Sequence, residues 1–300
     1  INQIILRGQT VLHEEIEPSN YFSFFSPEMI REFEISTYSK VISKKIIRSE
    51  ESVNVVIPAA GNGTRFAREG WKAPKPFIDI NGQLMIEHII KNLKISNSKV
   101  TLILRKEHIT NREKDIQRLE VSSSEIVKVD HLTEGTVSTV LLARKLIDRN
   151  QPLLIANSDQ IVDFDCNKFV NDSNARNLDG SILVFRDPFK DKKWSFVKLN
   201  DNGYVEEVAE KKAISDLATV GIYYFNNGSE FVSSAIDMIV RNERVNGEFY
   251  TCPVYNYMIS KGLKIGIYEI PFESMQGIGT PDDLMGYMKK MNFEDSIHKP

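Results

Sequence analysis

The stretch VNVVIPAAGNGTRF, residues 53–66, joins an apolar run to a glycine-rich turn, and Lys75 follows it between two prolines. An apolar run that ends at Ile57 predicts a short buried strand. Glycines let backbone N–H groups approach an anion closely, and Arg65 and Lys75 add fixed positive charge. This combination is typical of a strand-to-helix turn that binds a polyphosphate, so it predicts a nucleoside triphosphate as ligand.

Two other phosphate-binding motifs do not fit this turn. The third glycine of a dinucleotide-binding G-x-G-x-x-G turn would fall at Phe66, and no G-x-x-x-x-G-K-[ST] pattern is present. A plain βα turn with surface charges is the remaining alternative. The order of Arg65 and Lys75, with a predicted helix from Leu84 behind them, disfavours that alternative.

Composition narrows the class of protein. Of the 300 residues, 41% are hydrophobic and 26% charged, as in ordinary globular proteins, and the net charge of −3 argues against a nucleic-acid partner. No apolar run is long enough for a membrane span, and no signal peptide is visible. Cys166 and Cys252 lack metal or redox spacing. We expect a cytoplasmic protein with reduced thiols; a homo-oligomer remains an option.

Strands and helices alternate along the first half of the chain. This order predicts a parallel sheet with helices on both faces. The predicted strands are 53–57, 100–104, 125–129 and 153–156, and the predicted helices are 84–95, 111–119 and 136–147.

The pattern changes after residue 180. An N-D-N-G turn at 200–203 predicts a hairpin between strands 195–199 and 204–208. Further strands are predicted at 181–185, 217–225 and 264–270, and helices at 229–241, 251–260 and 281–291. Residues 1–50 are aromatic and turn-rich, with a short predicted helix at 28–34, and are interpreted as an N-terminal appendage or small subdomain.

Several ordered motifs resemble one family. GNGTR at 61–65, PKPFI at 74–78 and GQLMI at 82–86 match the G-x-G-[TS]-R, P-K-P-[LF]-[IV] and G-x-x-M-[IL] signature of sugar-1-phosphate nucleotidyltransferases. VAEK at 208–211 and GTPDDL at 279–284 agree with later markers. The resemblance implies a three-layer Rossmann-like, GT-A-like α/β fold with a mixed, mostly parallel sheet, and a catalytic domain at 51–293.

The resemblance also implies a reaction. A phosphate oxygen of a small acceptor, a sugar-1-phosphate, attacks the α-phosphorus of a nucleoside triphosphate, and pyrophosphate leaves. Such a transfer needs positioning and charge neutralisation more than covalent help. By resemblance, Lys75 binds the α-phosphate and Arg65 neutralises the pyrophosphate. The nucleotide is held by Ala60, Gly61, Gly63 and Thr64.

Two further segments are assigned by resemblance. Gly135 and Thr136 would lie against the nucleotide base, although Gly135-Thr136 could equally be an ordinary helix start. Asp159 follows a buried strand at the sheet edge where α/β proteins bind ligands, so it is the predicted Mg²⁺ ligand. Its alternative role is a helix N-cap.

The acceptor site is predicted from a charge pair after the hairpin. By resemblance, Glu210 binds an acceptor hydroxyl, Lys211 binds its phosphate, and Glu248 lies nearby; a solvated charge pair is the alternative interpretation. Trp194 could line the acceptor pocket, but we expect it to pack in the core, and 190–193 to form a solvated loop. The implied product is an activated precursor for a surface, capsule-type polysaccharide.

One departure from the family pattern affects the metal site. Many relatives carry a second metal-binding aspartate in a W-x-D-x-G-T pattern, and this chain has Gly277 there. Asp282 and Asp283 follow closely, but their position predicts helix capping. The departure also leaves the acceptor open.

Three alternative functions remain. A cytidylyltransferase could act on a phosphorylated alcohol, polyol or amino-acid derivative. An inverting GT-A glycosyltransferase would need a D-x-D-like site where this chain has Ser158-Asp159-Gln160, and it would leave Arg65 and Lys75 unexplained. An inactive regulatory subunit is disfavoured because Arg65, Lys75 and Asp159 are all present.

Overall fold

The computed structural model describes residues 52–293 of the chain. The predicted appendage at 1–50, including its helix at 28–34, lies outside the described residues. Within them, no helix is both long and apolar enough to cross a membrane.

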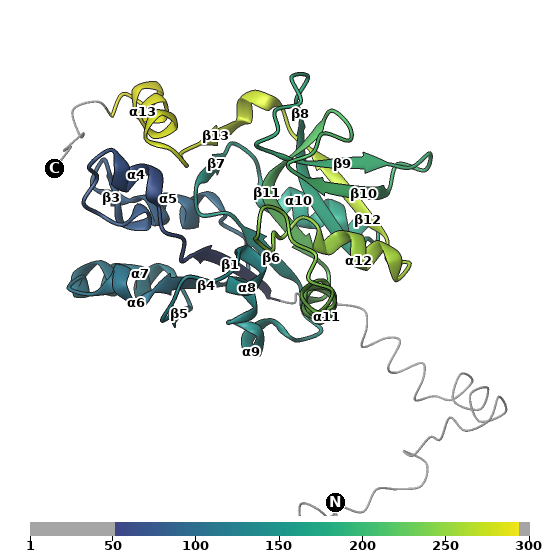
Figure 1. Ribbon diagram of the computed structural model, residues 1–300, viewed down its shortest axis with the longest axis horizontal. Coiled ribbons are helices and arrows are strands. Elements are labelled where there is room, and N and C mark those ends of the chain that lie inside the picture. Colours follow the sequence, from purple (N-terminus) through teal and green to yellow (C-terminus); the bar gives the residue numbers. More distant parts are fainter. Residues whose placement is uncertain (1–51, 294–300) are drawn as a thin grey trace, which may run out of the picture. The chain divides into compact units, whose positions relative to one another are not determined.

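A nine-stranded sheet forms the centre of the described domain (Figure 1). Apolar and β-branched residues dominate these segments, which favours the extended conformation. The strands are β1 (Val53–Ala59), β4 (Ser98–Arg105), β5 (Glu125–Val129), β6 (Leu153–Ala156), β8 (Gly180–Arg186), β9 (Ser195–Leu199), β10 (Val205–Glu210), β11 (Leu217–Phe225) and β12 (Ile265–Glu269).

The sheet is mixed and mostly parallel, as predicted. Its order is β10-β9-β11-β6-β1-β4-β5, and β8 pairs with both β11 and β12. β1 lies parallel between β4 and β6, with Asn54 beside Leu153 on one side and Lys99 on the other. β11 is antiparallel to β6, β8 and β9, so β10 and β11 are the strands that run opposite to the rest.

Successive side chains of a strand point to opposite faces of the sheet, so there are two hydrophobic cores, one on each face. In β1, Val55 and Ile57 face one core and Val56 the other. The first core packs on α5 (Met85–Asn92), α7 (Glu113–Ser122), α10 (Cys166–Ala175) and α13 (Pro281–Lys290). The second packs on α8 (Thr136–Leu141), α9 (Arg144–Ile147), α11 (Gly228–Val240) and α12 (Val254–Ser260). Three layers result, with each fully buried Val or Ile contributing about 1.5–3 kcal/mol.

The predicted helices differ in their bounds from those of the structure, and for three of them the difference has a clear local cause. The helix predicted over 136–147 breaks between α8 and α9, because Leu142 and Ala143 donate backbone hydrogen bonds to the third residue back instead of the fourth. The helix predicted from 251 begins after Pro253, a residue favoured at helix starts. Leu84 belongs to β3 and caps α5, its N–H donating to the Glu87 carboxylate at 2.7 Å.

Two short ribbons complete the fold. β2 (Asp79–Ile80) pairs with β3 (Gln83–Leu84) beside the helical turns α4 (Thr64–Arg68) and η2 (Lys75–Phe77). β7 (Gln160–Val162) pairs antiparallel with β13 (Met275–Gly277), which follows η3 (Phe272–Ser274), and Figure 1 shows the two strands side by side. The second ribbon brings the late segment from Met275 onward beside the end of β6.

His108, in α6 (Lys106–Ile109), is buried at 5% exposure. Burial, together with the positive charges of Arg105 and Arg112, lowers its pKa from 6.5 to about 4. The folded protein therefore keeps the ring neutral, whereas the unfolded chain takes up a proton below its ordinary pKa. The resulting stability is present above that ordinary pKa and is lost as the pH falls toward the folded-state value.

We expect titration of His108 to lower the free energy of unfolding by about 2 kcal/mol between about pH 7 and pH 5, because only the unfolded chain is protonated over most of this interval. Urea denaturation at the two pH values measures the loss. His108→Gln, which cannot titrate, is the matched control and should lose correspondingly less. Equal losses in both proteins would contradict the assignment.

Candidate active site

The residues predicted from sequence line one cleft of about 820 Å³. Its floor is the carboxyl edge of β1 and β6, which is where open α/β sheets bind ligands. The predicted residues that line it are Ala60, Gly61, Gly63, Thr64, Arg65, Lys75, Gly135, Thr136, Asp159, Glu210, Lys211 and Glu248. The fold thus brings the predicted phosphate, metal and acceptor residues together, and their individual roles remain predictions.

The turn after β1 is shaped by Gly63, which has a left-handed φ of 58° and caps α4. A Cβ added at Gly63 would lie 3.1 Å from Lys75 Cβ, so the glycine lets Lys75 pass close to the turn. Phe66, the residue that excludes a dinucleotide turn, is 1% exposed and packs edge-on against Trp71. The aromatic ring therefore anchors α4 in the core and fixes the end of the turn.

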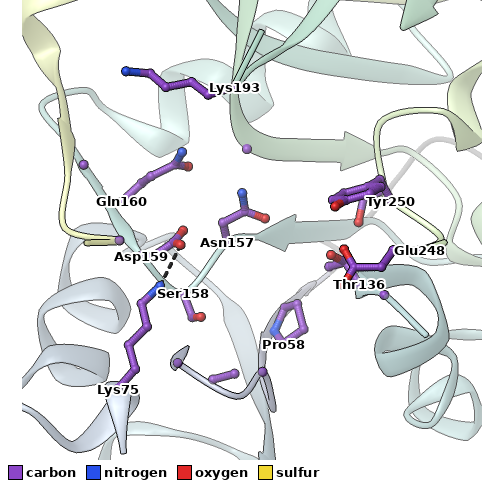
Figure 2. Close-up of a pocket in the computed structure, with 18 of the residues that line it drawn as sticks. Pro58, Lys75, Thr136, Asn157, Ser158, Asp159, Gln160, Lys193, Glu248 and Tyr250 are labelled. Atoms are coloured by element: carbon purple, nitrogen blue, oxygen red, sulfur yellow. Dashed lines mark hydrogen bonds and ion pairs between the residues drawn. The ribbon is translucent and has the colours of Figure 1, made fainter. Parts of the chain in front are cut away.

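Lys75 and Asp159 form an ion pair inside the cleft (Figure 2). The Nζ–Oδ2 distance is 2.7 Å, although the residues lie 84 positions apart. Pro74 and Pro76 fix the φ angles on either side of Lys75 and so limit where its side chain can start. A cation that could bind a phosphate oxygen and a carboxylate that could bind a metal ion are thereby held side by side.

The segment after β13 passes directly over Asp159. The Ile278 N–H donates to the Asp159 carbonyl at 2.9 Å, and a Cβ on Gly279 would lie 3.0 Å from Asp159 Oδ2. A side chain at position 279 would therefore crowd the carboxylate. The glycine leaves room for a ligand on Oδ2.

Gly277 stands where the W-x-D-x-G-T pattern has an aspartate, and a nearby carboxylate accounts for part of this difference. A Cβ built on Gly277 would lie 3.8 Å from Asp283 Oδ2, so the Asp283 carboxylate reaches toward the position where relatives carry an aspartate. Thr280 Oγ1 donates to Asp283 Oδ2 at 2.7 Å and accepts from the Asp283 N–H at 3.1 Å. Asp283 thus takes part in the predicted helix cap, and it also lines the cleft. No cluster of three metal-ligating side chains occurs in the described part of the chain.

Gly135, a predicted nucleotide-binding residue, lies against the backbone of Phe249, next to the predicted acceptor residue Glu248. A Cβ there would lie 2.5 Å from the Phe249 backbone nitrogen, and φ is 109°. The Phe249 N–H donates to Glu134 and its carbonyl accepts from Val137. A glycine is therefore required for this contact, independently of any nucleotide. Figure 2 shows Thr136 beside Glu248 as a result.

The part of the cleft that is predicted to bind the acceptor combines two carboxylates, a lysine and a tyrosine. Lys211 Nζ donates to Tyr250 Oη at 2.5 Å and lies 4.4 Å from the centre of its ring. Ser195 Oγ donates to Glu210. Burial raises the pKa of Glu210, while the Ser195 hydrogen bond and the charge of Lys211 oppose the rise. Since these groups are held by one another, Glu210-Lys211 is not a solvated surface pair.

Two residues of the cleft, Lys193 and Trp194, were expected mainly outside it, with the acceptor pocket as the alternative place for Trp194. Trp194 lines the cleft and also packs edge-on against Phe185, so it belongs to both wall and core. Lys193 lines the cleft as well, with its ammonium 3.2 Å from Asp191, instead of belonging wholly to a solvated loop. Both residues directly precede Ser195, the first residue of β9. Their closeness to that strand was the sequence feature that could have indicated a place in the cleft.

A glycine-rich turn after the first strand, and a lysine that meets an aspartate at the carboxyl edge of a mixed sheet, agree with the nucleotidyltransferase predicted from the sequence. The chain belongs to the nucleotidyl transferase family, whose model matches residues 54–272. This match confirms the resemblance seen in the sequence motifs.

Similar proteins support the family and the fold. A nucleoside-diphosphate-sugar pyrophosphorylase structure from Vibrio cholerae is 26% identical, covers 78% of this chain and 99% of its own, and has a TM-score of 0.68. The bifunctional protein GlmU of Clostridioides difficile is 26% identical over 240 residues, 76% of this chain and 49% of the relative. The mannose-1-phosphate guanylyltransferase catalytic subunit beta of Dictyostelium discoideum is 27% identical over 183 residues, 58% of this chain and 50% of the relative. The chain spans about half the length of these two curated relatives.

Replacing Gly135 with alanine should lower the free energy of unfolding by at least about 2 kcal/mol. The strain of alanine at a positive φ and the clash of its Cβ with the Phe249 backbone both contribute to this loss. Gly61→Ala is the matched control: no heavy atom lies within 4 Å of its added Cβ, so the change should stay within about 0.5 kcal/mol. Denaturant unfolding measures both. Equal stability of the two variants would refute the argument that Gly135 is required by packing.

Proposed function

We propose that the protein transfers a nucleoside monophosphate from a nucleoside triphosphate to a sugar-1-phosphate and releases pyrophosphate. The observation that carries the proposal is the Lys75–Asp159 pair at 2.7 Å, inside a cleft that Arg65 and the Glu210-Lys211 pair also line. A glycosyltransferase would leave the two cations that follow β1, Arg65 and Lys75, unexplained.

The chain's own residues supply positioning and positive charge. An acceptor phosphate oxygen forms a bond to the α-phosphorus while the bond to pyrophosphate breaks, so no group of the protein has to become covalently attached. Lys75 is placed to neutralise the charge that builds on the α-phosphate, and Arg65 the charge of the leaving pyrophosphate. The open main chain at Gly61 can approach the phosphates closely.

The residues around Asp159 fit Mg²⁺. Mg²⁺ prefers oxygen ligands and is commonly held by one or two carboxylates together with substrate phosphates and water. Gly279 keeps the space beside Asp159 Oδ2 open, and Asp283 supplies a further carboxylate at the same wall. When bound, Mg²⁺ would neutralise phosphate charge.

The acceptor end of the cleft fits a phosphorylated polyol or sugar. Glu210 and Glu248 can accept hydrogen bonds from hydroxyl groups, and Lys211 can pair with the phosphate. The family resemblance supports a cytoplasmic role in supplying an activated sugar for surface polysaccharide. The same groups would also suit a CTP-dependent enzyme that acts on another phosphorylated alcohol. The activity assay described next distinguishes these acceptors.

Pyrophosphate release over a grid of nucleoside triphosphates and phosphorylated acceptors tests the reaction. One pair should turn over, and in that pair Lys75→Met should lower kcat about 10²–10³-fold, because a cation is lost where charge builds. Lys72→Met, an exposed lysine outside the cleft, should stay within about twofold. The proposal fails if no pair turns over or if Lys75→Met equals the parent enzyme.

The metal assignment has its own test. Mn²⁺ binding in the presence of a non-hydrolysable triphosphate, followed by electron paramagnetic resonance, should weaken at least about tenfold in Asp159→Asn. Asp282→Asn removes an exposed carboxylate that does not line the cleft and should bind Mn²⁺ like the parent. Unchanged binding in Asp159→Asn would exclude Asp159 as a ligand.

A further inference from the structure

Arg105, the last residue of β4, is a cation buried beside the phosphate turn. It is 7% exposed. Leu104 lies opposite Ala59 in the parallel pairing of β4 with β1, so Arg105 comes alongside the point where the chain leaves β1. Neither the family motifs nor the lining of the cleft includes this residue.

The guanidinium has two described partners. Its Nη1 donates to the Asn62 side-chain oxygen, and its Nη2 pairs with Glu107 Oε1. Its buried Nε has no hydrogen-bond partner among residues 52–293. A buried guanidinium is costly unless it is partnered, so the contact with Asn62 is expected to persist.

Asn62 is the central residue of the G-N-G turn, and little else restrains it. Between β1 and α4, Gly61 and Asn62 make no backbone hydrogen bond to other described residues. Gly61 also has open space around it, since no heavy atom lies within 4 Å of a Cβ built there. The Asn62 side chain is therefore the tether that joins this part of the turn to the core.

We infer that Arg105 is a positioning residue for the triphosphate. It holds Asn62 and thereby fixes the main chain of the turn in the conformation that meets the phosphates. Ordering a flexible backbone on binding costs conformational entropy, and a turn that is already fixed avoids this cost. The inference rests on the proposed function, because it assumes that the turn binds a nucleoside triphosphate.

A double-mutant cycle tests the inference. The dissociation constant of a non-hydrolysable triphosphate with Mg²⁺ is measured by calorimetry for the parent, Arg105→Met, Asn62→Ala and the double variant. Each single variant should weaken binding about tenfold, and the double variant should be no weaker than the weaker single, because both changes break the same link. Lys106→Met is the control: this neighbouring cation pairs with Asp130 instead of the turn and should bind like the parent.

Steady-state kinetics separates positioning from general damage. The KM for the triphosphate should rise about tenfold in Arg105→Met and Asn62→Ala, while the KM for the acceptor stays within about twofold. Arg105→Lys should recover part of the affinity. Asn62 is exposed, so Asn62→Ala should fold normally and carry the test even if Arg105→Met unfolds.

Three results would overturn the inference: multiplicative losses in the double variant, unchanged affinity in Asn62→Ala, or equal rises in both KM values. Absence of triphosphate binding by the parent protein would instead refute the proposed function. The two failures are therefore distinguishable in one set of titrations.

Discussion

The ion pair between Lys75 and Asp159 is the interaction on which the geometry of the cleft depends. Asp159 follows β6, and Lys75 follows the turn that leaves β1. Parallel pairing of β1 with β6 is what brings the two segments to the same edge of the sheet. Any change that shifts that register would separate the cation from the carboxylate, so the buried Val and Ile residues of β1 serve the site as well as the core.

Close backbone contacts carry the rest of the site. A Cβ on Gly221 of β11 would lie 2.3 Å from Asn157 Nδ2 and 2.6 Å from Gln160 Oε1, so these two side chains can lie across β11 only at a glycine. Gly135 allows the same kind of approach to Phe249, and Gly279 to Asp159. The shape of the cleft therefore depends on a few glycines whose main chain lies in close contact with other residues. Substituting any one of these glycines would displace its neighbours.

The sequence predicted what depends on local pattern. Continuous apolar runs such as 53–57 and 217–225 have the length and composition of buried strands. The motifs at 61–65 and 74–78 indicated the turn and the lysine. The pairing of β7 with β13 was not predicted, because strands of three residues have no period and their contact joins distant parts of the chain. Lys193 was missed for a similar reason, and the acceptor pocket was only the alternative place for Trp194. The position of both residues in the cleft follows from how β9 joins β11.

A structure of the protein with Mg²⁺ and a non-hydrolysable nucleoside triphosphate tests the central claim most directly. The account predicts that Lys75 Nζ contacts an α-phosphate oxygen, that Asp159 contacts the metal, and that the phosphates lie along the main chain at 61–63. A nucleotide bound elsewhere, or bound in the cleft with Lys75 and Asp159 still paired only to each other, would contradict it.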